Sequence, residues 1–125
     1  EADLGVWWSF TTIFEAPGAF SKTAPANGAI DLATNPTLSW GSSLRATSYE
    51  YCISTIMDTC DGSWTSTGSN TSVALSGLSG DTNYYWQVRA LNAGGTVYAD
   101  TDTWWSFSTK AISFSTLLPL VQKAP

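Results

Sequence analysis

Apolar and polar residues alternate along several short stretches of this chain, and turn-forming residues separate the stretches. In residues 47–54 one face carries Tyr49, Tyr51 and Ile53, and the other carries Glu50, Cys52 and Ser54. In residues 83–91 the same spacing places four apolar side chains on one face, namely Tyr84, Trp86, Val88 and Ala90. A period of two is typical of a β-strand with one buried face.

Five further strands are predicted from the same pattern, at residues 29–33, 37–40, 63–67, 70–75 and 96–109. The last of these is long, and we expect an interruption near Asp100 to Asp102. The run Asn92-Ala93-Gly94-Gly95 predicts a hairpin turn. Short strands at regular intervals with turns between them indicate an all-β sandwich of about seven strands.

One segment of the chain occurs twice. The run Val6-Trp7-Trp8-Ser9-Phe10-Thr11-Thr12 recurs as Thr103-Trp104-Trp105-Ser106-Phe107-Ser108-Thr109, so that Trp7 corresponds to Trp104. We therefore expect residues 1–12 to be an orphan strand that resembles the last strand of a preceding repeat. Pro and Gly in the following segment predict a linker over residues 13–24. The sandwich domain is then expected over 25–110, with a hydrophobic C-terminal tail over 111–125.

Two cysteines, Cys52 and Cys60, are separated by eight positions, and the chain contains no histidine. Two thiols without further ligands do not make a zinc site. The alternatives are two free thiols or a local disulfide, and the Trp-rich, weakly charged composition favours the disulfide. A disulfide implies an oxidising compartment, so we expect a secreted or extracellular protein at the cell surface.

The charge distribution argues against several partners. Only 12% of the 125 residues are charged and the net charge is −5. The five basic residues are scattered and form no positive stripe, so nucleic acid is not an expected partner. No apolar run approaches the roughly 20 residues that span a bilayer, so no membrane span is expected.

No catalytic, cofactor-binding or metal-binding residue is predicted. The absence of histidine removes the usual nucleophilic triads and histidine acid–base chemistry. Two carboxylates could still serve a glycosidase, and the candidate pairs are Asp58 with Asp61 and Asp100 with Asp102. Both pairs occur in turns, where Asp is favoured for bonding to the backbone. A calcium loop would need six or more oxygen ligands. We therefore predict that the chain is not an enzyme and needs no cofactor.

Several of these residues resemble the fibronectin type III family. The resemblance rests on Trp40, on Tyr49 and on the run Leu78-Ser79-Gly80-Asp81-Thr82-Asn83-Tyr84-Tyr85-Trp86-Gln87-Val88-Arg89-Ala90, and it covers roughly residues 23–109. It implies a fibronectin type III or immunoglobulin-like sandwich. It also implies that Tyr84 is a tyrosine corner, whose hydroxyl bonds back to the backbone of the preceding loop.

The whole chain also resembles repeats from large secreted or surface proteins of bacteria, particularly those of Chloroflexota. Such repeats often end in a Trp-Trp-Ser-Phe strand, and their C-termini often carry a stretch like Leu118-Pro119-Leu120-Val121 followed by Lys123. The tail residues expected to make contacts are Ile112, Phe114, Leu117, Leu118, Leu120 and Val121.

Two classes of function follow from these observations. In the first, the chain is a structural subunit of a cell-surface filament or sheath, in which Val6 to Thr12 pairs with the sheet of another copy to give an open homopolymer. In the second, it is a carbohydrate-binding or spacer module of a secreted hydrolase or adhesin, with Trp64 as the candidate residue for glycan stacking. Strand alternation sends one ring of each Trp-Trp pair into the core and the other outward.

Overall fold

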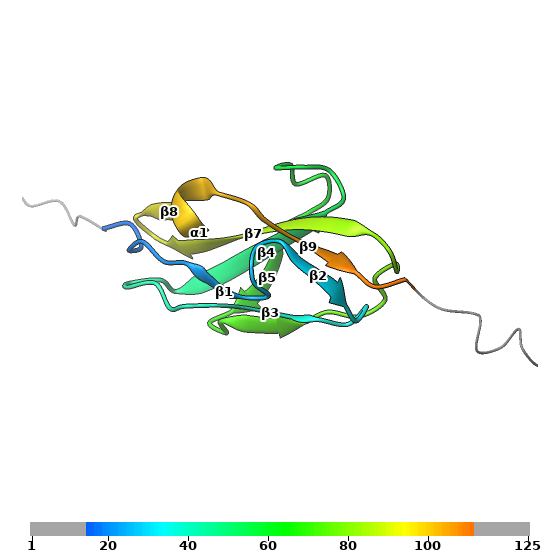
Figure 1. The fold of residues 1–125 in the computed structure, drawn as a ribbon. Helices are drawn as coiled ribbons and strands as arrows, with labels where there is room; N and C mark the ends of the chain where they lie inside the picture. Colours follow the sequence, from blue (N-terminus) through cyan, green and yellow to red (C-terminus); the bar gives the residue numbers. More distant parts are fainter. Residues whose placement is uncertain (1–14, 112–125) are drawn as a thin grey trace, which may run out of the picture.

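Two β-sheets pack face to face in the computed structural model, which describes residues 15–111 (Figure 1). The smaller sheet has the order β1-β3-β6, with β1 at Lys22–Ala24, β3 at Thr37–Trp40 and β6 at Ser72–Ala74. The larger sheet has the order β2-β9-β7-β4-β5, and these strands are Ala29–Leu32, Trp105–Thr109, Asn83–Asn92, Ser48–Ser54 and Thr65–Gly68. Strand β8, Gly95–Tyr98, also pairs with β7. The predicted all-β sandwich is confirmed.

The nine strand segments of residues 15–111 occupy seven strand positions, because the first and the last strand are each divided in two. β1 pairs antiparallel with β3, and after the cis Ala24–Pro25 peptide bond the chain changes sheets, so that β2 pairs parallel with β9. Near the C-terminal end of the described residues, a short turn, α1, at Ala99–Asp102 separates β8 from β9. The expected interruption of the last strand lies at this turn.

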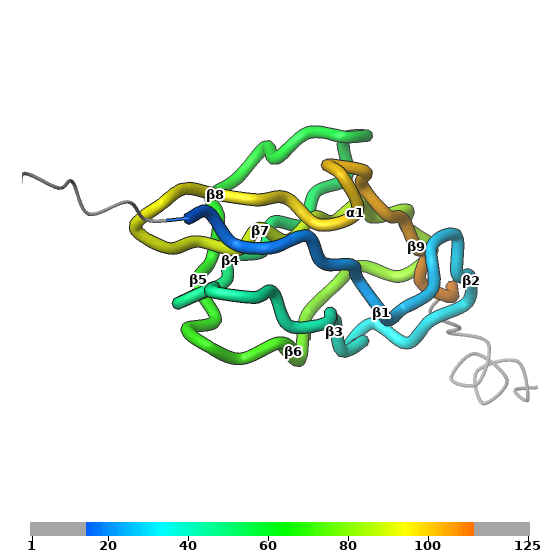
Figure 2. Tube along the Cα trace, turned by 90° about the vertical axis from the view of Figure 1, so that its left-hand side faces the viewer, coloured from blue at the N-terminus to red at the C-terminus, as the bar shows by residue number. Residues whose placement is uncertain are grey.

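Strand β1 lies inside the segment that was predicted to be a linker, 13–24. That prediction is wrong for residues 22–24, and the sandwich begins before residue 25. Phe20 is also buried in the core, and residues 15–21 run from the β7–β8 hairpin along the sandwich to β1 (Figure 2). A three-residue strand with a single buried side chain is too short to show a period of two, and Pro17-Gly18 obscured it further.

The core lies between the sheets and is rich in aromatic residues. Its largest buried side chains include Trp40, Trp86, Phe107, Tyr49 and Leu38. The predicted inner face of residues 47–54 is confirmed by the strand register, in which the three apolar residues of β4 lie opposite those of β7: Tyr49 opposite Ala90, Tyr51 opposite Val88 and Ile53 opposite Trp86. These pairs join the two central strands of the larger sheet to one hydrophobic core.

The outer face of β4 and β7 differs from the expectation for a strand with one solvated face. Cys52 and Gln87, which lie opposite each other on that face, are both buried, with exposed fractions of 2% and 0%. Other parts of the chain therefore cover the centre of the larger sheet on its outer side.

No helix among the described residues 15–111 is long and apolar enough to cross a membrane.

We predict that the core depends strongly on Leu38, which is fully buried. Leu38→Ala should lower the free energy of unfolding by about 2–5 kcal/mol, because it removes buried methyl groups and leaves a cavity. The matched control is Leu44→Ala, since Leu44 is 70% exposed and should change stability by only about 0.5 kcal/mol. Urea unfolding followed by Trp fluorescence measures both values. Equal effects of the two substitutions would contradict this assignment of the core.

Candidate functional site

An aromatic cluster lies on the outer side of the larger sheet, and we call Trp64, Tyr98 and Trp104 the outer aromatic cluster. The Trp64 ring is 5.8 Å from that of Tyr98 and 6.4 Å from that of Trp104, measured between ring centroids. The three residues come from the segment before β5, from β8 and from the segment before β9. All three are half-buried, and the rings are inclined to one another by 55–66°.

The two adjacent tryptophans before and in β9 point to opposite sides of the sheet. Trp105 pairs with Trp86 across the strands and packs edge-on against it, with 6.3 Å between centroids. Trp104 instead contacts Trp64 in the outer aromatic cluster. The predicted division of this Trp-Trp pair into one inner and one outer ring is confirmed.

Arg89 fixes the outer aromatic cluster to the sheet. Its guanidinium carbon lies 4.2 Å from the centroid of the Trp64 ring, and its Nη2 is 2.6 Å from a carboxylate oxygen of Glu50. Partial burial alone would lower the pKa of Arg89, but hydrogen bonds to Tyr98 and Glu50 outweigh this and raise it above its usual value. One face of Trp64 is therefore occupied by a permanently charged side chain of the same chain.

The predicted disulfide between Cys52 and Cys60 is present, with 5.8 Å between the two Cα atoms. It joins the middle of β4 to the loop that leads to β5, and so holds this loop against the outer face of the sheet. The loop buries Cys52 and Ser54 and exposes two apolar side chains, Ile56 and Met57. The disulfide explains why polar positions of β4 that were predicted to face solvent are covered.

Tyr84 makes the contact that the fibronectin type III resemblance implied. The backbone N–H of Ser79, in the loop before β7, donates a hydrogen bond of 2.8 Å to the Tyr84 hydroxyl. The ring is buried and packs against Phe107 of β9. This contact ties the preceding loop to the core.

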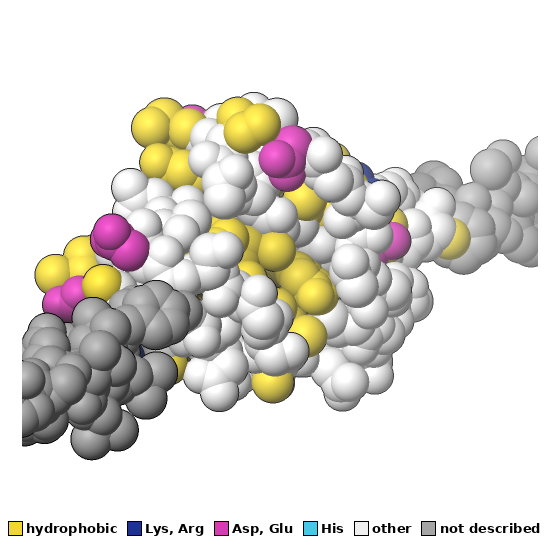
Figure 3. All heavy atoms as spheres, turned by 90° about the vertical axis from the view of Figure 1, so that its right-hand side faces the viewer, with side chains coloured by type: hydrophobic (Ala, Val, Ile, Leu, Met, Phe, Trp, Pro, Cys, Tyr) yellow, Lys and Arg dark blue, Asp and Glu magenta, His cyan; other side chains and the backbone are white. Residues whose placement is uncertain are grey.

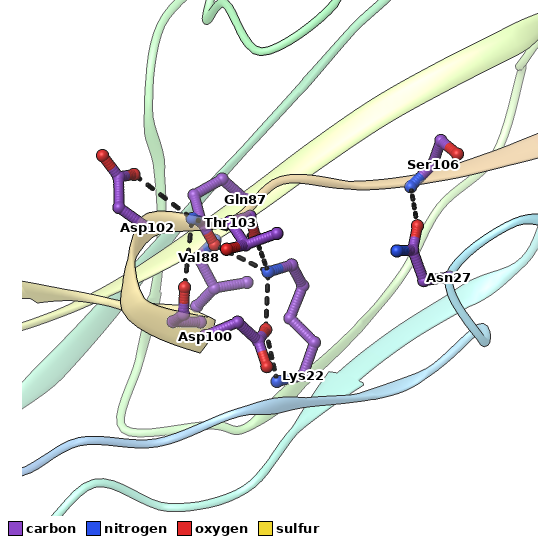
Figure 4. Close-up of polar contacts among 9 residues, drawn as sticks. Lys22, Asn27, Gln87, Val88, Asp100, Asp102, Thr103 and Ser106 are labelled. Carbon is purple, nitrogen blue, oxygen red and sulfur yellow. Dashed lines mark hydrogen bonds and ion pairs between the residues drawn. The ribbon is translucent and has the colours of Figure 1, made fainter.

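Several polar side chains are buried together at the break between β8 and β9 (Figure 4). We call the four residues Lys22, Gln87, Asp100 and Thr103 the Lys22 cluster. Lys22 leaves β1 and reaches the larger sheet. Its Nζ donates hydrogen bonds to Asp100 Oδ2 at 2.7 Å, to the Thr103 carbonyl at 2.7 Å and to Gln87 Oε1 at 2.9 Å. The side chain is fully buried, and Nζ lies 5.7 Å and 5.2 Å from the ring centroids of Trp86 and Trp105.

The Lys22 cluster fills a gap beside β7. β9 pairs with residues 83–86 of this strand and β8 with residues 89–92, so that Gln87 and Val88 have no partner strand on that side. The Gln87 side chain replaces the missing strand: its Oε1 accepts from the Val88 N–H at 2.9 Å, and its Nε2 donates to the Ala99 carbonyl at 3.2 Å. Buried backbone groups need such partners.

Asp100 is presented to Lys22 by an unusual turn. Asp100, Thr101 and Asp102 have φ values of 55°, 54° and 63°, so that three successive non-glycine residues are left-handed. Each costs roughly 1–2 kcal/mol relative to a right-handed residue, and such a turn persists only where its surroundings hold it. Burial lowers the pKa of the Lys22 ammonium, and the nearby Asp100 carboxylate offsets part of this effect.

Sequence reasoning did not find the Lys22 cluster. Lys22 lay in a predicted linker, Gln87 was a polar position on an outer strand face, and Asp100 was interpreted as a turn residue. The one signal in the sequence that pointed to such a cluster was the expected break in the last strand. Where that strand is broken, the neighbouring central strand needs another group to hydrogen-bond with its backbone.

Other predicted sites lie outside the described residues. The assembly strand, Val6 to Thr12, and the tail contacts from Ile112 to Val121 belong to residues 1–14 and 112–125. Within residues 15–111 no group of three or more Cys, Asp or Glu side chains could hold a metal ion. On the face shown in Figure 3, hydrophobic side chains gather in the middle, acidic side chains stand apart from one another, and almost no Lys or Arg surface is visible.

Comparison with known proteins supports the fold. No protein-family model matches this sequence, and no curated protein matches it. Among solved structures, the chain is similar to the sixth fibronectin type III domain of human fibronectin type III domain containing protein 3, with a TM-score of 0.53, 20% identity, and 85% of this chain and 93% of that domain covered. It is also similar to an Fn3-like protein from Clostridium thermocellum, with a TM-score of 0.50, 18% identity and coverages of 78% and 95%.

A third similar structure is an α-L-rhamnosidase from Dictyoglumus thermophilum, with a TM-score of 0.55 and 17% identity. The match covers 80% of this chain but only 13% of the rhamnosidase, so the chain corresponds to a small part of that enzyme's length. The fold of the described residues is therefore a fibronectin type III sandwich.

We predict that the disulfide stabilises the sandwich. Cys60→Ala should lower the free energy of unfolding by about 2–3 kcal/mol, mainly because the unfolded chain loses a cross-link. Dithiothreitol should lower the stability of the wild-type chain by a similar amount and leave that of the variant unchanged. A wild-type chain whose urea midpoint does not respond to reduction would contradict this role of the disulfide.

Proposed function

We propose that this chain is a non-catalytic structural module of an extracellular protein, of the bacterial secreted or surface type that its sequence resembles. The observation that carries this proposal is the position of the two ends of the described chain. Residue 15 lies at one end of the sandwich and residue 111 at the other (Figure 1).

Hydrogen bonds at the two ends of β7 also place residues 15 and 110 at opposite ends of the sandwich. At the β7–β8 turn, Asn92 Nδ2 donates to the Glu15 carbonyl at 2.7 Å. At the opposite end, the N–H of Asp81, just before β7, donates to the Lys110 carbonyl at 3.1 Å. β7 has ten residues and so spans about 33 Å. A module entered at one end and left at the other extends an assembly of modules by its full length.

The disulfide supports the extracellular part of the proposal. Cys52 and Cys60 form a disulfide, and such bonds persist in oxidising compartments. The scarcity of charge and the many Ser and Thr residues are compatible with the same location.

We further propose that copies associate through the repeated strand, to form a cell-surface filament or sheath. The segment Thr103 to Thr109, which Val6 to Thr12 repeats, already lies in its sandwich as β9 with its preceding residues, between β2 and β7. The front segment therefore has no vacant place of this kind in a complete copy. It would add at a sheet edge of a neighbouring copy, and the edge strands of residues 15–111 are β2, β5 and β8 in the larger sheet and β1 and β6 in the smaller.

Strand addition of this kind is a heterologous contact, which continues from copy to copy and gives an open homopolymer. The hydrophobic tail, residues 111–125, is proposed as a second contact between copies. Its apolar side chains from Ile112 to Val121 would contribute most of that contact.

The repeat predicts which front residues matter for assembly. Trp8 and Phe10 correspond to Trp105 and Phe107, of which Phe107 is buried and Trp105 packs on the core. The double variant Trp8→Ser and Phe10→Ser should therefore stay folded and no longer polymerise. The matched control, Ser9→Ala with Thr11→Ala, changes the opposite strand face and should polymerise like the intact chain.

Light scattering and electron microscopy measure both variants against a chain that lacks residues 1–12, which should be a folded monomer. Filaments formed by the shortened chain would show that the front segment is not the assembly strand. Loss of polymerisation in the control variant alone would also contradict the proposed register.

The alternative is a carbohydrate-binding or spacer module of a secreted hydrolase or adhesin, and the outer aromatic cluster is the observation that favours it. One similar structure is a rhamnosidase, of which the matching part is a small fraction. However, the rings of the cluster are inclined to one another and Arg89 covers one face of Trp64, so a flat stacking platform is not formed.

We therefore expect the chain to pass unretained over insoluble cellulose, xylan and chitin, and Trp64→Ala to behave identically. The second variant, Leu44→Ala, controls for a general change in surface hydrophobicity. Retention of the wild-type chain that is lost in Trp64→Ala and kept in Leu44→Ala would overturn the structural proposal in favour of glycan binding.

A further inference from the structure

The Lys22 cluster places an amine and a carboxyl group in contact where solvent is largely excluded. Lys22 Nζ and Asp100 Oδ2 are 2.7 Å apart, and the side chains of the two residues are 0% and 16% exposed. The rings of Trp86 and Trp105 enclose the amine from the core side. In such surroundings an ion pair is expensive to keep charged, because both groups have lost their hydration.

The carboxyl group is held against the amine from several directions. The backbone N–H of Lys22 donates to the same Asp100 Oδ2 at 3.1 Å, and the Asp100 N–H donates to the Phe20 carbonyl at 2.9 Å. Both contacts come from β1 or the segment leading to it. Three consecutive left-handed residues then bend the chain so that Asp100 faces Lys22. A strained turn that directs one reactive group onto another is a geometry that folding has to maintain.

We propose that Lys22 and Asp100 condense to an amide when the chain folds, so that the first and last strands become covalently joined. The ammonium first passes one proton to the carboxylate, which leaves a neutral amine and a carboxylic acid that carries its proton on Oδ1. The Nζ lone pair then attacks Asp100 Cγ and forms the C–N bond. Oδ1 takes a second proton from the attacking nitrogen and leaves as water, and Oδ2 remains as the amide oxygen. The balance is one ammonium and one carboxylate giving one amide and one water, without a further reactant.

The neighbouring groups suit each step of this reaction. Burial lowers the pKa of Lys22 and so favours the amine that must attack. The Lys22 backbone N–H already points to Oδ2, where negative charge develops during the attack, and stabilises it there. Because the fold already holds the amine beside the acyl carbon, the reaction does not bear the entropy cost of bringing them together.

After condensation, the buried acceptors of the Lys22 cluster still have hydrogen-bond donors. The amide nitrogen retains one hydrogen, whereas the ammonium donated to three acceptors. Gln87 Oε1 keeps the hydrogen bond from the Val88 N–H, and the Thr103 carbonyl keeps a contact of 3.4 Å with Gln87 Nε2. No buried acceptor of the cluster is left without a donor, so condensation carries no penalty of that kind.

The bond would change how the module responds to tension. A pull on residues 15 and 111 would pass through the amide between Lys22 and Asp100, and residues 23–99 would carry no load. This consequence is useful in a spacer, but the chemistry itself does not rest on the proposed function.

Intact-mass spectrometry of the whole, reduced and denatured chain tests the amide directly. The wild-type chain should be lighter than its sequence by one water molecule, and peptide mapping should give a branched peptide that contains Lys22 and Asp100. Lys22→Arg and Asp100→Ala should have their full sequence masses. The matched control, Lys110→Arg, replaces an exposed lysine and should still lose one water.

Several results would overturn the proposal. The first is a wild-type chain of full sequence mass that is folded, as shown by near-ultraviolet circular dichroism and an intact Cys52–Cys60 disulfide before reduction; this result needs no variant. The second is a water loss that persists in Lys22→Arg, as cyclisation of Glu1 would cause. The third is loss of ammonia instead of water, which would place the link at Gln87.

Discussion

The arrangement of this sandwich depends on how it fills one gap beside its central strand. The last strand leaves β7 after Tyr98 and returns at Trp105, and the Val88 N–H, which faces this gap, would otherwise be buried without a partner. The Gln87 side chain, the left-handed turn and Lys22 together occupy the gap. Because Lys22 belongs to the smaller sheet, the same contact joins the two layers and holds β1 against the turn that precedes β9.

The outer face of the larger sheet shows a related principle. Fibronectin type III sandwiches have two sheets, and here a partial third layer covers the larger one. The disulfide holds one loop over β4, and Arg89 anchors the outer aromatic cluster over β7. Both devices bury polar strand positions.

These features agree with the proposed role as a structural module. Its chain enters and leaves on opposite sides, and its first and last strands meet at the Lys22 cluster. The strand β9 already occupies the position that the repeated front segment imitates. The proposed association between copies through that segment would therefore use edge strands, and it would be physically separate from the stability of the sandwich itself.

The amino-acid sequence alone determined the strand pattern, the hairpin at Asn92, the opposite orientations of Trp104 and Trp105, and the break in the last strand, because each depends on local periodicity and turn chemistry. It also left two possible states for the two cysteines, a disulfide or two free thiols, and favoured the disulfide. Tertiary structure alone decided that β1 exists, that Cys52 and Gln87 are buried on an outer face, and that Lys22 meets Asp100. These contacts join residues 65 and 78 positions apart, and no local period reports which distant segment will cover a given strand.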